Sequence, residues 1–340
     1  MLGSLALASV LLAQAAGDSA AAEAKHLKDI RQVTSGLLKA GEGYFRPDGK
    51  AIIYQAVRPG TEDYQIFTQD LAPGSTARMV STGKGKCTCS YYHPDGKSIL
   101  FASSHLDPAL SSESKTEAQP KGPAYNRSGA SYRWDFEPAM DIFRANLDGS
   151  NLVRLTDTPG YDAEGTYLPD GKSIVFTSFR DGDGEIYIMD ADGKNPRRIT
   201  HAKGYDGGPF FSPDGKKLLY RSDRKGNDLL QVYMNNLEGT AERALTNDEH
   251  VNWGPSWHPD NRHVIFATSR FGHSNYDLML IDTESGAEER ITFREGFDGL
   301  PVFSPDGSQL MWTSSGRTSD RKSQLFLADF QLGPPSAVDQ

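Results

Sequence analysis

The sequence predicts an all-β protein, a six-bladed β-propeller whose ring is closed by an N-terminal strand that completes the last blade. The first observation is a repeat: a Pro-Asp-Gly core, with Asn replacing Gly once, recurs at Pro47, Pro94, Pro169, Pro213, Pro259 and Pro305. The period is 44 to 47 residues, apart from one interval of 75. A fixed period of this size is typical of repeat architectures. The other observations are four strand-like segments in each period and a spare segment at the start of the chain.

The first two strands of each period flank the Pro-Asp-Gly core. Aromatic residues occur two positions before each proline and seven positions after it. The two columns are Phe45, Tyr92, Tyr167, Phe211, Trp257 and Phe303, and then Tyr54, Phe101, Phe176, Tyr220, Phe266 and Trp312. The second column ends a short apolar run without polar alternation, which indicates a strand covered on both faces. Proline presets φ and glycine tolerates a positive φ, so the core predicts a tight hairpin turn.

Two further strands complete each period. The third strand contains an apolar pair, which is Ile66-Phe67, Ile142-Phe143, Ile186-Tyr187, Val232-Tyr233, Leu278-Met279 or Leu325-Phe326. The fourth strand contains an aliphatic residue followed by threonine or serine, which is Val33-Thr34, Val80-Ser81, Leu155-Thr156, Ile199-Thr200, Leu245-Thr246 or Ile291-Thr292. Four short strands cannot bury their own faces, and radial stacking into a closed ring hides the edges of such sheets. The sequence therefore predicts one blade for each period.

The two ends of the repeat region predict how the ring closes. The last period ends near Phe330 without its outer strand, whereas the chain begins with a spare strand at Ile30–Thr34. We expect this strand to pair antiparallel with Leu325–Phe330, so that residues 26–330 form one propeller domain. A linear array of hairpins is the alternative, and it leaves the spare and missing strands unexplained.

The ends of the chain and its charge indicate location and partners. The apolar run Leu2–Leu12, followed by Ala13-Gln14-Ala15, predicts a signal peptide at residues 1–16. We therefore expect a periplasmic or secreted monomer without membrane insertion; a frayed N-terminal helix is the alternative. Residues 331–340 are predicted to be a flexible tail. The net charge is −9 and no lysine-rich run occurs, which argues against nucleic acid as a partner.

The candidate site residues gather on one predicted face of the ring. This face should carry the loops that lead into the first strands and the loops that join the second strands to the third, and we call it the loop face. The opposite face, which should carry the Pro-Asp-Gly turns, is called the turn face. Seven positions before the proline, a column supplies Asp162, Asp206, Asn252 and Asp298. Glu164 follows two residues after Asp162, so we expect it on the same side of that strand, where it could add a further oxygen ligand. If these side chains converge, their charges repel, and oxygen ligands suit a hard cation such as Ca²⁺ in the central channel. The alternative is that arginines neutralise them.

Arginines and histidines supply the candidate binding residues of the loop face. Eleven positions after the proline, the column includes Arg180, Arg224 and Arg270, which either bind a partner or pair with carboxylates of the ring. His105, His201, His250 and His273 also fall in loop-face segments. Scattered loop histidines are more often solvated than ligands, so a close cluster of the four would favour a metal enzyme. Cys87 and Cys89, the only cysteines, lie two apart on one strand, where a disulfide is disfavoured.

The long interval holds an insert at residues 107–137, between the second and third strands of the second blade. Its first half is polar, and its second half contains Trp134 and Phe136, aromatic residues that the repeat does not need. We expect the insert to overhang the loop face as a lid or a partner-docking arm.

The repeat resembles the WD40-like propeller repeats of the TolB type, in which FSPDGK, an apolar run and S-x-R recur with IY-x-M-D-x-DG and R-I-T. The resemblance covers about Asp29 to Phe330 and implies a propeller that serves binding, as TolB binds a lipoprotein in the periplasm. The small α/β domain that precedes the TolB propeller is not expected here, since only about a dozen residues separate the predicted signal from the first strand. Related propellers include metal-dependent lyases that act on acidic sugars.

These observations predict an exported, non-catalytic propeller that binds a protein or peptide on the loop face. No catalytic residue is assigned, and no Gly-x-Ser-x-Gly nucleophile elbow occurs in the sequence. Apart from Ca²⁺ in the channel, no cofactor is expected. The alternative is a metal-dependent lyase or hydrolase that acts on an acidic saccharide at the channel mouth.

Overall fold

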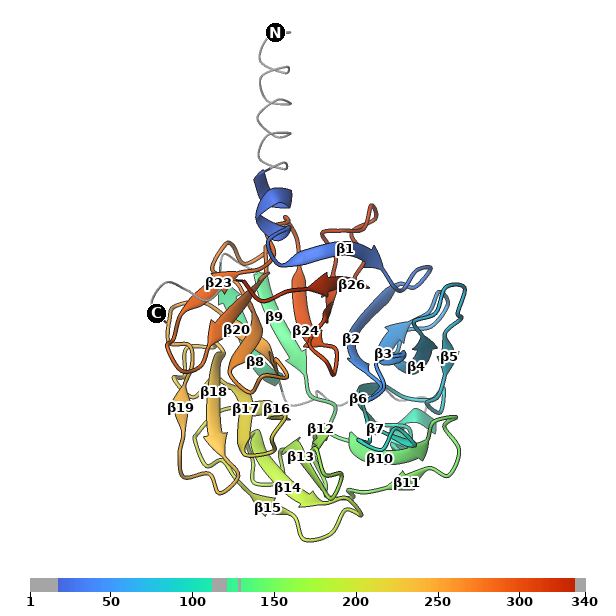
Figure 1. Ribbon diagram of the computed structural model, residues 1–340. Coiled ribbons are helices and arrows are strands. Elements are labelled where there is room, and N and C mark those ends of the chain that lie inside the picture. The colour runs from blue at the N-terminus through green and yellow to red at the C-terminus, as the bar shows by residue number, and fades with distance from the viewer. Residues whose placement is uncertain (1–17, 112–120, 128–129, 334–340) are drawn as a thin grey trace.

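The computed structural model is a closed ring of six four-stranded antiparallel sheets (Figure 1), as the repeat predicts. It describes residues 18–111, 121–127 and 130–333, with the backbone alone for residues 111, 121–127 and 130–135. The predicted signal peptide and most of the predicted tail lie outside the described residues. Within them, no helix is long and apolar enough to cross a membrane.

The blades follow the chain, with the first strand of each nearest the axis. Blade 1 is β2 (Lys39–Phe45), β3 (Ala51–Val57), β4 (Gln65–Asp70) and β5 (Arg78–Met79); blade 2 is β6 (Cys87–Tyr92), β7 (Ser98–Ser103), β10 (Asp141–Asn146) and β11 (Val153–Arg154). Blade 3 is β12 (Asp162–Tyr167), β13 (Ser173–Ser178), β14 (Glu185–Asp190) and β15 (Arg197–Arg198); blade 4 is β16 (Asp206–Phe211), β17 (Lys217–Ser222), β18 (Gln231–Asn236) and β19 (Arg243–Ala244). Blade 5 is β20 (Asn252–Trp257), β21 (His263–Thr268), β22 (Asp277–Asp282) and β23 (Glu288–Arg290); blade 6 is β24 (Asp298–Phe303), β25 (Gln309–Ser314), β26 (Gln324–Phe330) and β1 (Leu27–Gln32).

The turn chemistry and the aromatic columns explain how each blade holds together. The turn glycines have φ near +70°, and Asn261, which replaces glycine in blade 5, also has a positive φ of 62°. The aromatic residue of each second strand lies directly opposite an apolar residue of the third, as in Tyr54 opposite Phe67 and Trp312 opposite Phe326. Such cross-strand pairs stabilise a sheet. Both columns are therefore buried between neighbouring sheets.

The threonine or serine two residues after each fourth strand has a structural role that recurs around the whole ring. Its hydroxyl oxygen accepts a hydrogen bond from the backbone N–H of a third-strand residue. The acceptors are Thr34, Ser81, Thr156, Thr200, Thr246 and Thr292, at 2.9 Å in every blade. Because Thr34 makes this bond with Leu325, the N-terminal strand takes the same place in blade 6 as the fourth strand takes elsewhere.

The ends of the chain meet in blade 6, as predicted, with a small shift in the strand bounds. β1 pairs antiparallel with β26, with Leu27 opposite Phe330 and Gln32 opposite Phe326. The strand begins three residues earlier than expected, and Val33 still donates to the carbonyl of Leu325 at 2.8 Å. Gln331 is bonded to His26 through its backbone, so the first residue assigned to the flexible tail belongs to the ordered ring.

A β-bulge interrupts every first strand at the same place, where the register shifts against the second strand. The bulge residue, five positions before the turn proline, has a positive φ in each blade. These residues are Glu42 (49°), Cys89 (52°), Glu164 (58°), Gly208 (59°), Gly254 (57°) and Leu300 (52°). A bulge leaves a residue outside the hydrogen-bonded ladder and re-aims its side chain.

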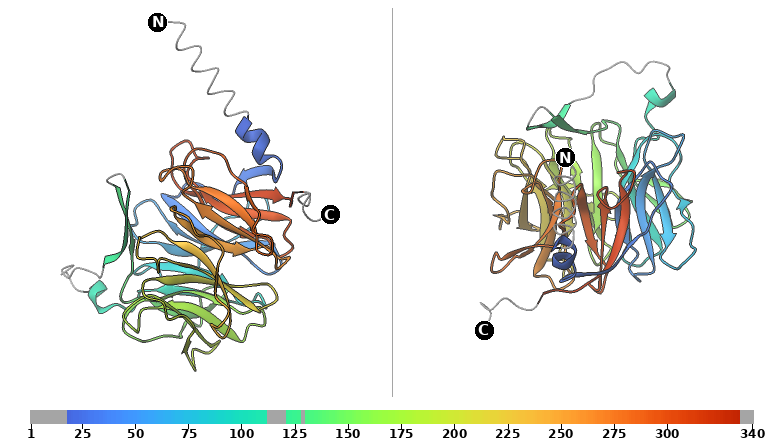
Figure 2. Two further views of the ribbon diagram at one scale, coloured as in Figure 1. Left: turned by 90° about the vertical axis from the view of Figure 1, so that its left-hand side faces the viewer. Right: turned by 90° about the horizontal axis from the view of Figure 1, so that it is seen from above.

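The insert leaves the ring between β7 and β10, at the end of blade 2 where its first strand, β6, begins and its second strand, β7, ends. It contains a short 3-10 helix, Pro108–Ser111, and a two-stranded sheet of β8 (Lys121–Arg127) and β9 (Ala130–Asp135). Figure 2 shows this hairpin projecting from one face of the ring. This is the loop face, since Cys87, Ser103 and Asp141 are aligned at the end of blade 2 from which the insert departs.

Candidate functional site in the central channel

The six bulge residues line a cavity on the axis of the ring. The cavity is small: its empty space is about 460 Å³ only when the open solvent at its mouth is included. The first strands of all six blades contribute to its wall. On the side nearer the turn face, the rings of Tyr44, Tyr91 and Phe210 meet across the channel, with centroids 5.1 to 6.4 Å apart. The channel is therefore not an open bore, because these rings form a floor beneath the cavity.

The ring of bulge residues is chemically asymmetric. Blades 1 to 3 supply Glu42, Cys89 and Glu164, whereas blades 4 to 6 supply Gly208, Gly254 and Leu300. Pro255, Pro301 and Val302 add to the apolar side of the cavity wall. Polar groups and apolar surface thus face one another across a small cavity, which is the general character of a small-ligand site.

A buried ion pair joins blades 3 and 4 at this level. Arg221 in β17 donates from Nη2 to Glu164 Oε1 at 2.5 Å, and both side chains are less than one-tenth exposed. Thr177, Tyr205 and the backbone N–H of Gly208 also donate to the Glu164 carboxylate, at 2.6 to 3.0 Å. Four donor groups therefore compensate the desolvation of this carboxylate, which a buried charge requires.

Gly208 makes room for Arg221 to enter the channel. A Cβ atom at position 208 would lie 2.0 Å from Nη1 of Arg221, a distance that no side chain can adopt. The positive φ of Gly208 also favours glycine. The glycine and the arginine therefore act as a unit that brings one positive charge from the second strand of blade 4 into the cavity.

Glu42 is the acidic residue of the ring that lacks strong partners. Tyr44 donates to its Oε1 over a long 3.4 Å, and the Cys89 thiol lies 3.8 Å from its Oε2. Burial, and then the negative charge of Glu164, raise the pKa of the Glu42 carboxyl to about 7. Burial also raises the pKa of the Cys89 thiol, so it stays protonated and is a poor nucleophile.

Replacing Glu42 with glutamine should remove a pH-dependent loss of stability. The raised pKa means that the folded state keeps the proton of Glu42 longer than the unfolded state, whose pKa is near 4.5. The stabilising contribution is complete below pH 4.5 and is lost as the pH rises through 7. We expect the free energy of unfolding of Glu42→Gln to equal that of the natural protein at pH 4. At pH 8 we expect it to be higher than that of the natural protein by up to about 3 kcal/mol. Urea denaturation at both pH values measures this, with the exposed Glu62→Gln as the control; equal curves at pH 8 would contradict it.

Of the five predicted metal ligands, Glu164 lines the channel cavity, and Asp162, Asp206, Asn252 and Asp298 do not. Asp162 and Asp206 are buried and accept hydrogen bonds from Arg180 and Arg224, at 3.1 and 2.8 Å. Asp298 likewise accepts from Trp312 at 3.1 Å and lies 3.6 Å from Arg317. These pairs lie within one blade, not between neighbouring blades. The described residues include no group of three or more His, Cys, Asp or Glu side chains that could hold a metal ion.

Glu164 and Asp162 were expected to lie on the same side of β12, and this expectation is wrong. The bulge between Ala163 and Thr166 breaks the alternation of side chains, so Glu164 faces the cavity while Asp162 pairs with Arg180 at the strand end. The side chains of Cys87 and Cys89 also have different surroundings, because a bulge interrupts β6 between Thr88 and Tyr91. Cys87 packs in the core beside Ser103, whereas Cys89 lines the cavity.

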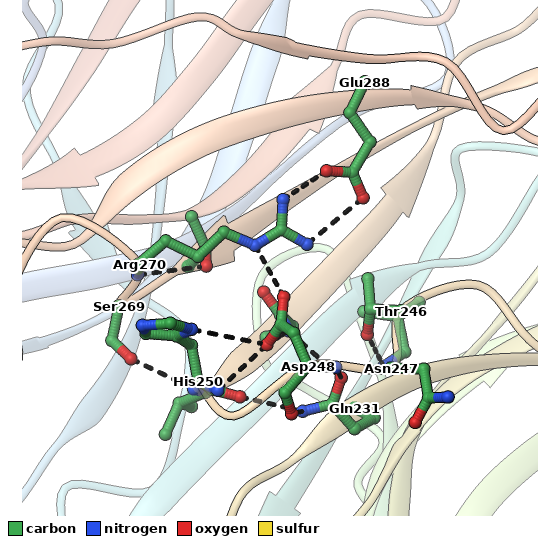
Figure 3. A network of polar contacts seen from close by, with 12 residues as sticks. Gln231, Thr246, Asn247, Asp248, His250, Ser269, Arg270 and Glu288 are labelled. Atoms are coloured by element: carbon green, nitrogen blue, oxygen red, sulfur yellow. Dashed lines mark hydrogen bonds and ion pairs between the residues drawn. The ribbon is translucent and has the colours of Figure 1, made fainter.

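Blade 5 shows how the arginine column keeps its partner when the aspartate is missing. Asn252 stands where three other blades have aspartate, and Arg270 instead donates to Asp248 at 2.7 Å. Asp248 also accepts from the Asn252 amide at 2.9 Å. Figure 3 shows Arg270 between Asp248 and Glu288, which pairs with the other end of the guanidinium. In blade 5 the carboxylate that neutralises the arginine therefore comes from a residue four positions before Asn252. Arg180, Arg224 and Arg270 are thus all engaged in ion pairs within their own blades.

The four loop-face histidines do not form a common cluster. Three of them contact residues of their own blade or loop, and the fourth is exposed. The contacts are His105 with Ser103 and Phe143, His250 with Asp248, and His273 with Tyr276, while His201 is the exposed one. The criterion set for a histidine-based metal site is not met among these residues.

Phe136 anchors the insert and is not exposed to a partner. Phe136 is 7% exposed, and the centroid of its ring lies 4.5 to 5.3 Å from the ring centroids of Phe179, Tyr161 and Tyr205. The binding role predicted for Phe136 is therefore corrected to a structural one. Trp134 lies in β9, and its side chain is outside the described part of the insert.

The sequence columns did not identify the ring of bulge residues, because its six members share no residue type. Arg221 was the residue whose position in the sequence could have indicated the site, because it is a charged residue inside a strand predicted to be covered on both faces. A buried arginine needs a buried partner. The search for that partner leads to Glu164 and hence to the channel.

The fold and the repeat also match known proteins. Residues 179–248 and 228–338 match the family model described as the TolB beta propeller domain. The ring is a TolB-type β-propeller. A 39-residue segment is 54% identical to the Tol-Pal system protein TolB of Bordetella pertussis, and of Bordetella parapertussis, and covers 12% of this chain. The matched segment spans only 9% of the length of those relatives.

Solved structures resemble the TolB-type propeller over most of the chain. A putative TolB from Agrobacterium tumefaciens has a TM-score of 0.59 at 22% identity, covering 86% of this chain and 91% of that one. TolB from Acinetobacter baumannii has a TM-score of 0.58 at 21% identity, covering 85% and 63%. An oligogalacturonate lyase from Vibrio parahaemolyticus has a TM-score of 0.52 at 16% identity, covering 88% and 93%. Similarity at these identities indicates a shared fold and not a shared activity.

Proposed function

We propose that this TolB-type propeller is an exported, non-catalytic protein that binds a protein or peptide on its loop face. The observation that carries the proposal is the hairpin β8–β9, which departs from the repeat and stands on the loop face above the ring (Figure 2). A segment that the repeat does not need, held at its base by the buried Phe136, is a natural docking element. The Bordetella relatives, named as components of the Tol-Pal system, support a role in a protein assembly.

The polar residues predicted for the same face take part in contacts within the ring. Its arginine and aspartate columns are consumed in ion pairs such as Arg224 with Asp206, which hold each blade together. Loops that are fixed in this way form a rigid platform around the channel mouth. A preorganised platform lowers the entropic cost of binding a partner.

Export to the periplasm or the medium is part of the proposal, supported by the apolar run Leu2–Leu12 and the Ala13-Gln14-Ala15 site. The mature chain recovered from cells should begin near Ala16 or Gly17, as mass spectrometry of the intact protein can determine. A cytosolic protein that retains Met1 would contradict export.

Removal of residues 111–132 should weaken binding to the native partner by about tenfold or more, which corresponds to ~1.4 kcal/mol. The ring should remain folded, because Phe136 and the six blades are retained. The partner can be isolated from the envelope with the full chain as bait, and its affinity for the full chain and for the shortened chain compared by surface plasmon resonance.

Two point variants refine this experiment. Trp134→Ala in the insert should weaken binding, whereas Val153→Ala, which alters an exposed residue of the outer strand of blade 2, should leave it unchanged. If the partner binds the shortened chain and Trp134→Ala with unchanged affinity, the insert is not the docking element.

A further inference from the structure

We propose that the cavity of the central channel binds a protonated primary amine, with the ammonium group at Glu42 and the aliphatic chain against the apolar wall. The site lies inside the ring and involves residues other than the insert. The proposal therefore goes beyond partner binding on the loop face, and it can fail or succeed independently of it.

Charge is the first argument for a cationic ligand. The cavity holds three charged side chains, and the positive charge of Arg221 is already matched by Glu164 at 2.5 Å. Glu42 is left with only a distant tyrosine hydroxyl and a thiol as partners. When Glu42 is ionised, the cavity therefore has a net negative charge that no described side chain neutralises. A cation placed beside it would remove this cost.

Unsatisfied hydrogen-bonding capacity is the second and independent argument. Ser90, which lines the same cavity, is 1% exposed, and its hydroxyl has no hydrogen-bond partner among the described residues. Buried hydroxyls usually have a partner, so this one points to a group that the protein does not supply itself. An ammonium group has three N–H donors, and the cavity offers acceptors in the Glu42 carboxylate and the oxygens of Ser90 and Tyr44.

The remaining wall favours an amine on an aliphatic chain over a bare metal ion. Pro255, Leu300 and Pro301 face the cavity and would contact methylene groups. A metal ion would need several oxygen ligands, but the Glu164 carboxylate is already occupied by four donor groups. The floor of aromatic rings around Tyr44 also limits the depth of the cavity, so a short chain fits best.

The test uses the full mature chain at pH 8 with propylammonium chloride as the probe, followed by isothermal titration calorimetry. We expect saturable binding of propylammonium, and none of 1-propanol, which has the same shape without the charge. Glu42→Gln should abolish binding, Ser90→Ala should weaken it at least about fivefold, and the exposed Glu62→Gln should leave it unchanged. Thermal unfolding of each variant separates loss of the site from loss of the fold.

Further arms identify the source of the amine and the outcomes that overturn the proposal. A capped peptide containing lysine, compared with its acetyl-lysine form, shows whether a side chain of a polypeptide can reach the site; binding of propylammonium but not of this peptide assigns the site to free small amines. The proposal is overturned if propylammonium does not bind, if propanol binds equally well, or if Glu42→Gln retains binding. Deletion of residues 111–132 should leave amine binding intact, which keeps this result separate from partner binding.

Discussion

Deletion of residues 18–35 should lower the melting temperature by roughly 10 °C or more, because it opens the ring at blade 6. The deletion removes β1, leaves the Leu325 amide without its Thr34 acceptor, and leaves the buried Arg317 with Asp298 at 3.6 Å in place of Glu23 at 2.6 Å. A buried donor left without its partner costs about 1–3 kcal/mol. Two such losses amount to ~4 kcal/mol, and each 1 kcal/mol shifts melting by about 2–4 °C in a domain of this size or somewhat smaller.

Differential scanning calorimetry measures this effect, with deletion of residues 334–340 as the control at the other end. Point variants give a sharper comparison: Thr34→Val and Thr156→Val remove the same hydrogen bond, at 2.9 Å in both cases, from the closing blade and from blade 2. If β1 is equivalent to a fourth strand, the two variants should cost a similar 1–2 kcal/mol. Unchanged melting of the 18–35 deletion would mean that the ring does not depend on this closure.

Replacement of Arg221 with methionine should destabilise the protein by about 3–5 kcal/mol, since it leaves the buried Glu164 carboxylate without its counter-charge. Thr177, Tyr205 and the Gly208 N–H would still donate to Glu164, which places the expected loss nearer the lower limit. Urea denaturation at pH 7 measures the change in the free energy of unfolding.

The double variant Arg221→Met with Glu164→Gln distinguishes charge from packing. With both charges removed, most of the stability should return, because replacing a buried ion pair by neutral groups is often close to neutral. If the double variant is as unstable as Arg221→Met alone, the guanidinium contributes through its packing against Tyr205 and not through its charge.

The repeat allowed the fold to be predicted in detail, because each of its columns has a role that recurs in every blade. The clearest case is the threonine column, whose member Thr34 identified the closing strand before any contact was known. The site was less predictable. Period-two alternation along a strand placed Glu164 beside Asp162, whereas the bulge turns Glu164 into the channel. A bulge arises from the backbone geometry of the ring, and no residue type marks it in this chain.

The function of the arginine column was open in the sequence for a related reason. A residue that recurs through most of the repeat either serves the repeat or lines a shared surface, and spacing does not separate the two. Contacts do: Arg180 bonds to the aspartate of its own blade, and Arg270 finds Asp248 when that aspartate is replaced by Asn252. The shifted partner in blade 5 indicates that the pairing itself is what the structure needs.

The close approach of Arg221 to Gly208 has an evolutionary consequence. A Cβ atom at position 208 would lie 2.0 Å from Nη1 of Arg221, so a side chain there would force the guanidinium away from Glu164 unless the arginine had been lost first. Loss of the arginine first would in turn leave the Glu164 carboxylate unpaired. Homologous propellers that carry this arginine and glutamate should therefore also carry the glycine, whereas the glycine can persist where the arginine and glutamate are absent.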